Sequence, residues 1–370
     1  MSAFAPLFEP FTFSGLKLDN RIVMAPMTRS FSPDGVPGQD VADYYARRAA
    51  ADVGLLITEG TTINRKASSF DTRVPNFYGD ASLKGWAHVV DEVHKEGGKI
   101  APQIWHVGMM RKEGSGPFPD VKSDSPSGLT HKAKPVYEEP TTEEIEAIIK
   151  AFVDGIVTAK ELGFDCAEIH GAHGYLVDEF FWHVMNTRSD RFGGSLKARA
   201  QFAGEIIAEA RKLVGPDYPI ILRISQWKQQ DYAARLAETP KELEDFLTVF
   251  ADAGVSCIHY SQRRFWEPEF PEIDGEDGLN FAGWGKKITG LPAITVGSVG
   301  LASDFLGSFA GESSKTRPLI DVVNRLDKGE FDLVAVGRAL LQDPHWATKV
   351  KEGRESELKD YDGAAIKTLF

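Results

Sequence analysis

The chain has 370 residues, of which 42% are hydrophobic and 26% are charged, and its formal net charge is −12. This is the composition of an ordinary globular protein, and its negative field repels polyanions, so nucleic acid is not an expected partner. The length fits one α/β barrel with inserted loops, and no internal boundary divides it, so residues 1–370 are expected to form a single domain.

The start of the chain, Met1 to Phe13, lacks a basic segment followed by an apolar run, and no apolar run approaches the length of a membrane span. Cys166 and Cys257 each lie inside an apolar run, which indicates buried thiols rather than a disulfide framework or a metal cluster. The sequence therefore favours a cytoplasmic protein without a membrane anchor or a metal site. Both a monomer and a homodimer stay open.

Short apolar runs bounded by Gly, Pro or Asp recur along the chain and alternate with segments of helical period. We expect strands at Arg21 to Ala25, Val53 to Glu59, Lys99 to Trp105, Phe164 to His170, Pro219 to Ser225, Val255 to Ser261, Leu291 to Gly297 and Phe331 to Gly337. Several runs are nearly continuous in Val, Ile, Leu and Ala, as in parallel strands covered on both faces. Eight βα units most simply close into a (β/α)8 TIM barrel, although an open doubly wound sheet fits the same pattern.

One predicted helix is well marked, because Thr141 and Glu144 form a capping box and Gly163 ends the apolar repeat that follows. Before it, residues 107–140 make the longest irregular stretch, rich in Gly, Pro, Ser and Lys, directly after the third strand. Active sites of such barrels gather at the carboxyl ends of the strands. We therefore expect residues 107–140 to form a lid or rim over that mouth.

Polar or glycine-containing segments stand where the predicted strands end, as an active site in this fold requires. They are Pro26 to Arg29, Glu59 to Thr61, Gln103 with Trp105 and His106, His170 to Tyr175, Arg223, Gly297 with Ser298, and Gly337 with Arg338. No lysine stands at a predicted strand end where it could form a Schiff base, since Lys99 begins its strand.

The fourth strand is followed by His170, His173 and Tyr175. Two imidazole N–H groups can donate to one carbonyl oxygen and stabilise the charge that develops on it, and a protonated phenol can act as an acid. The alternatives are a histidine that bonds a backbone carbonyl and a His-x-x-His metal site, but no Asp, Glu or Cys completes a ligand set in that loop.

Two glycine-containing turns, Gly297 to Gly300 and Gly337-Arg338, lie where this fold commonly binds phosphate through backbone N–H groups. Arg338 adds a cation suited to bidentate phosphate contact. Arg223, at the end of an apolar strand, is a charge that needs a partner.

Four segments, in order along the chain, resemble the old yellow enzyme family of FMN-dependent ene-reductases: Asn20 to Arg29, Glu168 to Leu176, Asn186 to Ser195 and Val336 to Leu340. The resemblance covers nearly the whole chain. It implies an oxidoreductase that takes hydride from NAD(P)H and reduces the activated C=C bond of an α,β-unsaturated carbonyl or nitro compound. It also implies that His170 and His173 polarise the activating group and that Tyr175 is the proton donor.

The resemblance further implies a tightly bound, non-covalent FMN. Arg223 would face the N1/O2 edge of the flavin, Gln103 the N3/O2 edge, and Thr28 would bond O4. The remaining cofactor residues that it implies are Ala25, Pro26, Met27, Gly60, His170, Gly297, Ser298, Gly337 and Arg338. Candidate walls of the substrate pocket are Trp105, Trp227, Tyr260 and Phe265.

The chain departs from the family pattern in several loops. Many relatives read Trp-His-x-Gly-Arg after the third strand, whereas Met109 and Met110 precede Arg111 here, so any pocket role of that arginine is absent or falls to Arg111. Trp105 and Thr28 resemble the family branch that carries those residues, and Thr28 excludes the branch that carries a cysteine at that position. Residues 107–140, 225–244 and 263–277 are atypical, and the sequence leaves the physiological substrate, the preference between NADH and NADPH, and the stereochemistry undetermined.

Two other functions fit parts of the pattern. One is a flavin-free phosphate-binding barrel enzyme of the aldolase or isomerase type, and the other is a non-catalytic flavin-binding protein. The second would keep Arg223 and the phosphate turns but would not need the histidine pair and the tyrosine.

Overall fold

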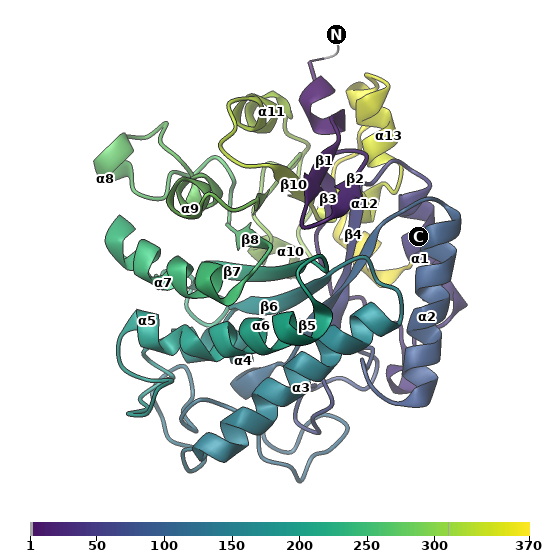
Figure 1. Cartoon of the computed structure of the whole chain (residues 1–370). Helices are drawn as coiled ribbons and strands as arrows, with labels where there is room; N and C mark the ends of the chain where they lie inside the picture. Colours follow the sequence, from purple (N-terminus) through teal and green to yellow (C-terminus); the bar gives the residue numbers. More distant parts are fainter. Residues whose placement is uncertain (1–2, 310) are drawn as a thin grey trace.

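The computed structural model describes residues 3–309 and 311–370, and it confirms the barrel (Figure 1). The strands close in the order β10-β3-β4-β5-β6-β7-β8-β9, and each neighbouring pair is parallel. They are β3 (Ile22–Met24), β4 (Leu55–Thr62), β5 (Ile100–Trp105), β6 (Ala167–His173), β7 (Ile220–Lys228), β8 (Cys257–Ser261), β9 (Ala293–Val296) and β10 (Leu333–Val336). Each overlaps the run predicted for it, and closure excludes the open sheet.

Helices surround the barrel, and further short helices lie in the loops between (Figure 1). The α-helices are α1 (Gln39–Ala49), α2 (Asp80–Lys95), α3 (Thr142–Glu161), α4 (Leu176–Phe181), α5 (Leu196–Arg199), α6 (Gln201–Val214), α7 (Pro240–Ala253), α8 (Pro271–Asp274), α9 (Phe281–Thr289), α10 (Leu306–Phe309), α11 (Ile320–Asp327), α12 (Arg338–Gln342) and α13 (Trp346–Lys351). The 3-10 turns are η1 (Ala5–Phe8), η2 (Pro33–Gly35), η3 (Gly108–Met110), η4 (Glu355–Glu357) and η5 (Gly363–Lys367).

Helix α3 begins as its sequence predicts. The hydroxyl of Thr141 accepts a hydrogen bond from the backbone N–H of Glu144, and the Glu144 carboxylate accepts one from the backbone N–H of Thr141. This reciprocal cap satisfies two of the N–H groups that a helix start leaves unpaired. The chain then leaves the helix through Gly163, whose φ of +86° favours glycine.

The amino-terminal end of the barrel is closed by a hairpin that the strand pattern does not predict. Strands β1 (Phe11–Phe13) and β2 (Leu16–Leu18) pair antiparallel, and Phe13, Leu16 and Leu18 pack against the apolar interior of the barrel. Three-residue strands are too short to show a period of two. With this end filled, the carboxyl ends of the strands are left to form a site.

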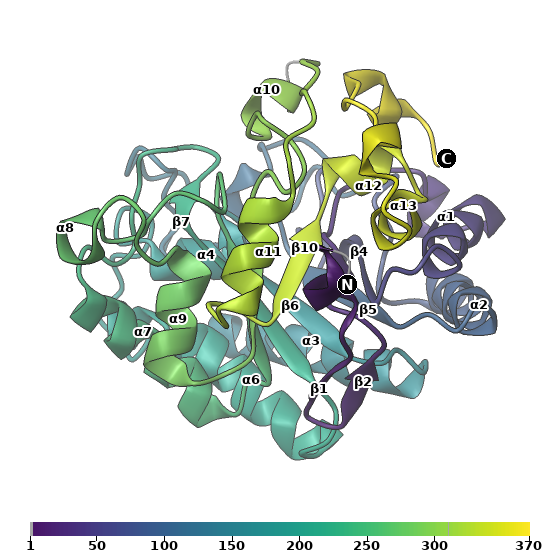
Figure 2. The same ribbon diagram turned by 90° about the horizontal axis from the view of Figure 1, so that it is seen from above.

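The carboxyl-terminal segment packs next to helix α1 (Figure 2). The guanidinium of Arg48 in α1 donates to the carbonyls of Leu340 and Phe370. Both cysteines are buried free thiols, as predicted. Over the ranges 3–309 and 311–370, no helix combines the length and the apolar character that crossing a bilayer requires.

Candidate active site

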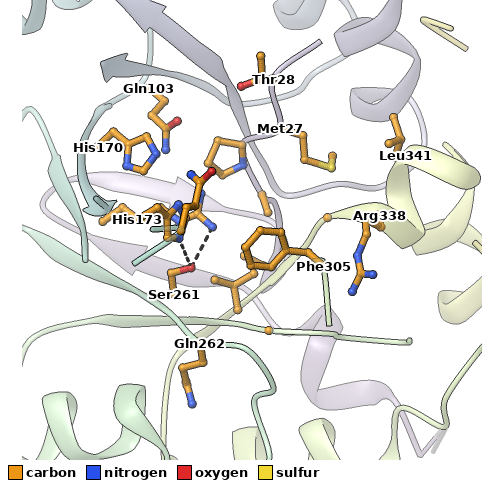
Figure 3. A pocket seen from close by; sticks show the side chains of 18 of the residues that line it. Met27, Thr28, Gln103, His170, His173, Ser261, Gln262, Phe305, Arg338 and Leu341 are labelled. Carbon is orange, nitrogen blue, oxygen red and sulfur yellow. Dashed lines mark hydrogen bonds between the residues drawn. The ribbon is translucent and has the colours of Figure 1, made fainter. Parts of the chain in front are cut away.

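A cavity of about 420 Å³ opens at the carboxyl ends of the barrel strands (Figure 3). Most of the residues singled out in the sequence line it: Ala25, Pro26, Met27, Thr28, Gln103, Trp105, His170, His173, Tyr175, Arg223, Trp227, Gly297, Ser298, Gly337 and Arg338. They come from six of the eight strands and the loops that follow them. Closure of the barrel is therefore what brings these separate sequence segments to one place.

His170, His173 and Tyr175 form one wall of this cavity. The ring of His170 lies 5.1 Å from that of His173 and 5.1 Å from that of Tyr175, measured between centroids. Trp105 packs edge-on against Tyr175 at 5.0 Å, and His173 stacks on Trp227 at 4.5 Å. The aromatic neighbours hold the three polar rings in fixed positions.

Burial sets the protonation of these groups. It lowers the pKa of His170 and of His173 well below the ordinary value, and the positive charge of Arg223 lowers both further. Burial raises the pKa of Tyr175. At neutral pH the site therefore holds two uncharged imidazoles, each with one N–H, beside a protonated phenol.

The loop that carries His173 and Tyr175 is tied to the extended end of β7. His173 has a left-handed φ of +68°, and its backbone N–H donates to the hydroxyl of Ser225 at 2.9 Å. Asp178 accepts from the backbone N–H of Gly174 at 2.7 Å through one carboxylate oxygen. Its other oxygen accepts from Lys228 at 2.7 Å, and both side chains of this ion pair have zero exposure.

Lys228 also corrects an expectation from the sequence, which placed no lysine at a strand end. Strand β7 extends to Lys228, three residues past the predicted end at Ser225. Gln226 and Lys228 are polar, yet both are buried in this extension of the strand. Because Lys228 is held by Asp178 and does not line the cavity, it is not placed to react with a carbonyl.

Arg223 enters the cavity as a cation with few contacts. Its Nη2 lies 3.4 Å from Ser261 Oγ, and its buried Nε has no hydrogen-bond partner in the described part of the chain. Burial lowers its pKa to about 10, so it stays protonated at neutral pH. A buried charge with unused donors calls for an acceptor that occupies the cavity.

The two predicted phosphate turns lie side by side, because β9 and β10 are neighbours. Gly297 has a φ of +154°, and a side chain there would place its Cβ 2.9 Å from the carbonyl oxygen of Gln262. This close approach explains the glycine. The guanidinium of Arg338 donates to the carbonyls of Ser303 and Asp304, and it lines the same end of the cavity.

Three candidate residues are not at the cavity. Gly60 contacts Trp105 instead, since a Cβ at Gly60 would lie 2.7 Å from the indole, so the glycine makes room for that ring. Tyr260 points outward from β8 and packs edge-on against Phe281. Phe265 is buried beside Trp266 in the core. The pocket-wall assignments of Tyr260 and Phe265 were wrong. Tyr260 alternates along β8 with His259 and Ser261, which face inward, and Phe265 lies in the loop after β8 and packs into the core.

Of residues 107–140, the segment expected as a lid or rim, only Met110 lines the cavity. Arg111 turns away from it and donates to the carbonyls of Val121 and Phe118, so it organises its own loop. Asp124 holds the loop to the barrel through Arg65, at 2.6 Å. The segment therefore contributes one residue to the cavity and is otherwise held by contacts of its own.

The cavity is also lined by residues that the sequence does not predict. Phe305, in the segment after β9, lines the cavity, and its ring centroid lies 5.0 Å from that of Trp227 (Figure 3). Tyr361 comes from the carboxyl-terminal segment. Ser261 lies 2.7 Å from His173 Nε2 and also contacts Arg223, and it ends a predicted strand, so the strand-end rule could have found it.

Comparison with known proteins gives consistent matches. The model of the NADH:flavin oxidoreductase / NADH oxidase family matches residues 6–307. NADH oxidase of Thermoanaerobacter brockii is 34% identical over 97% of this chain, although the chain spans only 52% of that protein. The 12-oxophytodienoate reductase 7 of Oryza sativa subsp. japonica is 36% identical over 92% of this chain and 86% of its own length. The structure of morphinone reductase in complex with tetrahydroNAD superposes with a TM-score of 0.80 at 26% identity, covering 97% of this chain and 93% of that one.

The cavity fits FMN in its chemistry. The unused donors of Arg223 suit the electron-rich N1/O2 edge of a flavin, and the turns at Gly297 and Gly337 with Arg338 offer donors for a phosphate at the other end. Apolar side chains that line the cavity, such as Met27 and Leu341, suit the flavin ring system. The chain therefore belongs to the NADH:flavin oxidoreductase / NADH oxidase family, the old yellow enzyme family of FMN-dependent oxidoreductases.

Proposed function

We propose that this protein takes hydride from NAD(P)H and reduces the activated C=C bond of α,β-unsaturated carbonyl compounds or nitroalkenes. The observation that carries the proposal is the convergence of His170, His173 and Tyr175 on one wall of the cavity that fits FMN. Bound FMN supplies the hydride chemistry. Two proteins of similar sequence or fold are named 12-oxophytodienoate reductase and morphinone reductase, which supports this substrate class.

The histidine pair binds the activating group. Both imidazoles are neutral at pH 7, and each can donate one N–H to the same carbonyl or nitro oxygen. These donors stabilise the negative charge that builds on that oxygen during reduction. The same pair offers donors to the carboxamide of the nicotinamide when NAD(P)H occupies the site.

Tyr175 supplies the proton. Burial keeps its phenol protonated at neutral pH, and its ring lies 5.1 Å from that of His170, beside the bound activating group. The hydroxyl donates its proton to the α-carbon, and solvent restores it. A Schiff-base aldolase is disfavoured, because Lys228 is paired with Asp178 and does not line the cavity.

The direct test is the visible spectrum of the purified protein, followed by turnover. We expect a yellow protein, or apoprotein that becomes yellow with FMN, that oxidises NADPH or NADH when 2-cyclohexenone, a nitroalkene or a maleimide is added. A preparation that stays colourless with FMN would remove the flavin assignment. A yellow protein that reduces no activated alkene would instead be a flavoprotein of another activity.

Phenol binding tests the histidine pair. A phenolate in the cavity accepts one N–H from each imidazole, so His170→Ala and His173→Ala are each expected to weaken phenol binding by about 10- to 100-fold, from hydrogen bonds to a charged group of about 1.5–3 kcal/mol. The long-wavelength charge-transfer band on titration reports the binding. His94→Ala, an exposed histidine paired with Asp165, is the matched control and should bind phenol as the wild type does. Unchanged affinity in both site variants would contradict the paired-donor role.

A further inference from the structure

A buried hydrogen-bonded network of Gln103, Glu168 and His259 lies below the cavity. Glu168 in β6 has zero exposure, and its Oε1 accepts a hydrogen bond from Gln103 Nε2 of β5 at 2.8 Å. Its Oε2 lies 2.7 Å from Nδ1 of His259 in β8, which is also fully buried. Glu168 therefore joins strands on both sides of β6 inside the barrel.

The register of the strands places this network beside Arg223. Gln103 pairs with Glu168, His170 with Arg223, and Arg223 with His259. Glu168 precedes His170 by two residues, so both side chains face the same side of β6. Burial lowers the pKa of Arg223, and the negative charge of Glu168 acts against that shift. Glu168 is thus the buried counter-charge of the cation at the cavity floor.

Glu168 also decides which end of the Gln103 amide faces the cavity. A carboxylate oxygen only accepts hydrogen bonds, so the amide nitrogen of Gln103 must point to Glu168. The carbonyl oxygen of Gln103 is then the atom left for a ligand, and Gln103 lies beside His170 on the cavity wall (Figure 3). The N3–H of a flavin is a donor, which matches this oxygen.

We propose that Glu168 is a positioning residue that fixes the Gln103 amide and offsets the charge of Arg223, and that it thereby lowers the reduction potential of the bound flavin. Arg223 alone favours the negative charge that collects at the N1/O2 edge of reduced FMN. A fixed negative charge below it reduces that preference, because charges in a weakly polar interior interact over several ångströms. The inference rests on FMN binding and is independent of which alkene the enzyme reduces.

Glu168→Gln tests the charge while keeping the size of the side chain. At equilibrium with a reference dye of known potential, the ratio of reduced to oxidised FMN is expected to rise at least tenfold, which is about 30 mV for a two-electron couple. His259→Gln disturbs the same network but leaves the carboxylate, so its ratio should stay within threefold of wild type. An unchanged ratio in Glu168→Gln, or an equal rise in His259→Gln, overturns the proposal.

Cys257→Ala is the packing control, because Cys257 is a buried uncharged residue of the same barrel interior. It should leave the ratio of reduced to oxidised FMN within twofold of wild type.

If Glu168→Gln fails to fold, Glu168→Asp tests the proposal instead, since it keeps the negative charge but has a shorter side chain that no longer reaches Gln103. We expect its dye equilibrium within threefold of wild type and its FMN dissociation constant at least threefold higher. A tenfold rise in reduced FMN with the charge retained would contradict the proposal.

Discussion

Tyr175→Phe is expected to lower turnover of a weakly activated enone such as 2-cyclohexenone by about 10²- to 10⁴-fold, the usual contribution of a positioned general acid. The substitution removes the phenolic proton and keeps the ring that packs against Trp105 and His170. Reduction of the flavin by NAD(P)H needs no proton from this hydroxyl. Stopped-flow measurement of the two half-reactions should therefore show normal flavin reduction and slow reoxidation by the enone.

The tyrosine prediction has a matched control in Tyr232→Phe. Tyr232 lies outside the main cavity, against Trp227, and its hydroxyl has no hydrogen-bond partner among the described residues. Both half-reactions should stay within about twofold in this variant. Nitroalkenes should lose less rate in Tyr175→Phe than enones do, because the nitronate formed by hydride transfer is a stable anion that can leave the site before it is protonated. Enone turnover within threefold of wild type would remove Tyr175 as the proton donor.

Lys228→Met is expected to cost about 3–5 kcal/mol of unfolding free energy, because it leaves the carboxylate of Asp178 buried without its partner. The substitution should also affect the site, because Asp178 accepts a hydrogen bond from the backbone N–H of Gly174, between His173 and Tyr175. Urea unfolding followed by tryptophan fluorescence measures the stability. Lys241→Met, an exposed lysine paired with Glu244, is the control and should change stability by no more than about 0.5 kcal/mol.

The cost of Lys228→Met should depend on pH. Burial already raises the pKa of Asp178 to about 6, and removing the lysine raises it further. The folded variant then holds a proton that the unfolded chain, with an ordinary aspartate pKa, releases above about pH 4. Unfolding free energy therefore falls as pH rises through the folded pKa, so the deficit against wild type should be smaller at pH 5 than at pH 8. A second substitution, Asp178→Leu, should recover part of the loss, and an equal deficit at both pH values would count against a buried carboxylate as its cause.

The sequence alone predicts the barrel and most of the cavity, because both depend on local patterns. Each strand is an apolar run between turn residues, and residues at the carboxyl ends of parallel strands meet once the barrel closes. This is why Thr28, Gln103, His170, Arg223 and Gly337 line one cavity although they span most of the chain. The alternation of strand faces could also have shown that Tyr260 turns away from it, since His259 and Ser261 point inward.

Only the tertiary structure decided how these side chains are paired and oriented. Glu168 meets His259 across 91 positions of the chain, and Asp178 meets Lys228 across 50. Arg111 turns into its own loop, and Tyr361 returns from the carboxyl-terminal segment to the cavity. Hydrogen bonds and ion pairs of this kind depend on distances and directions between distant segments, and no local period or spacing encodes them. The sequence therefore predicts where the strands of this protein end. The network of buried charged and polar groups behind the site forms only when the barrel has closed.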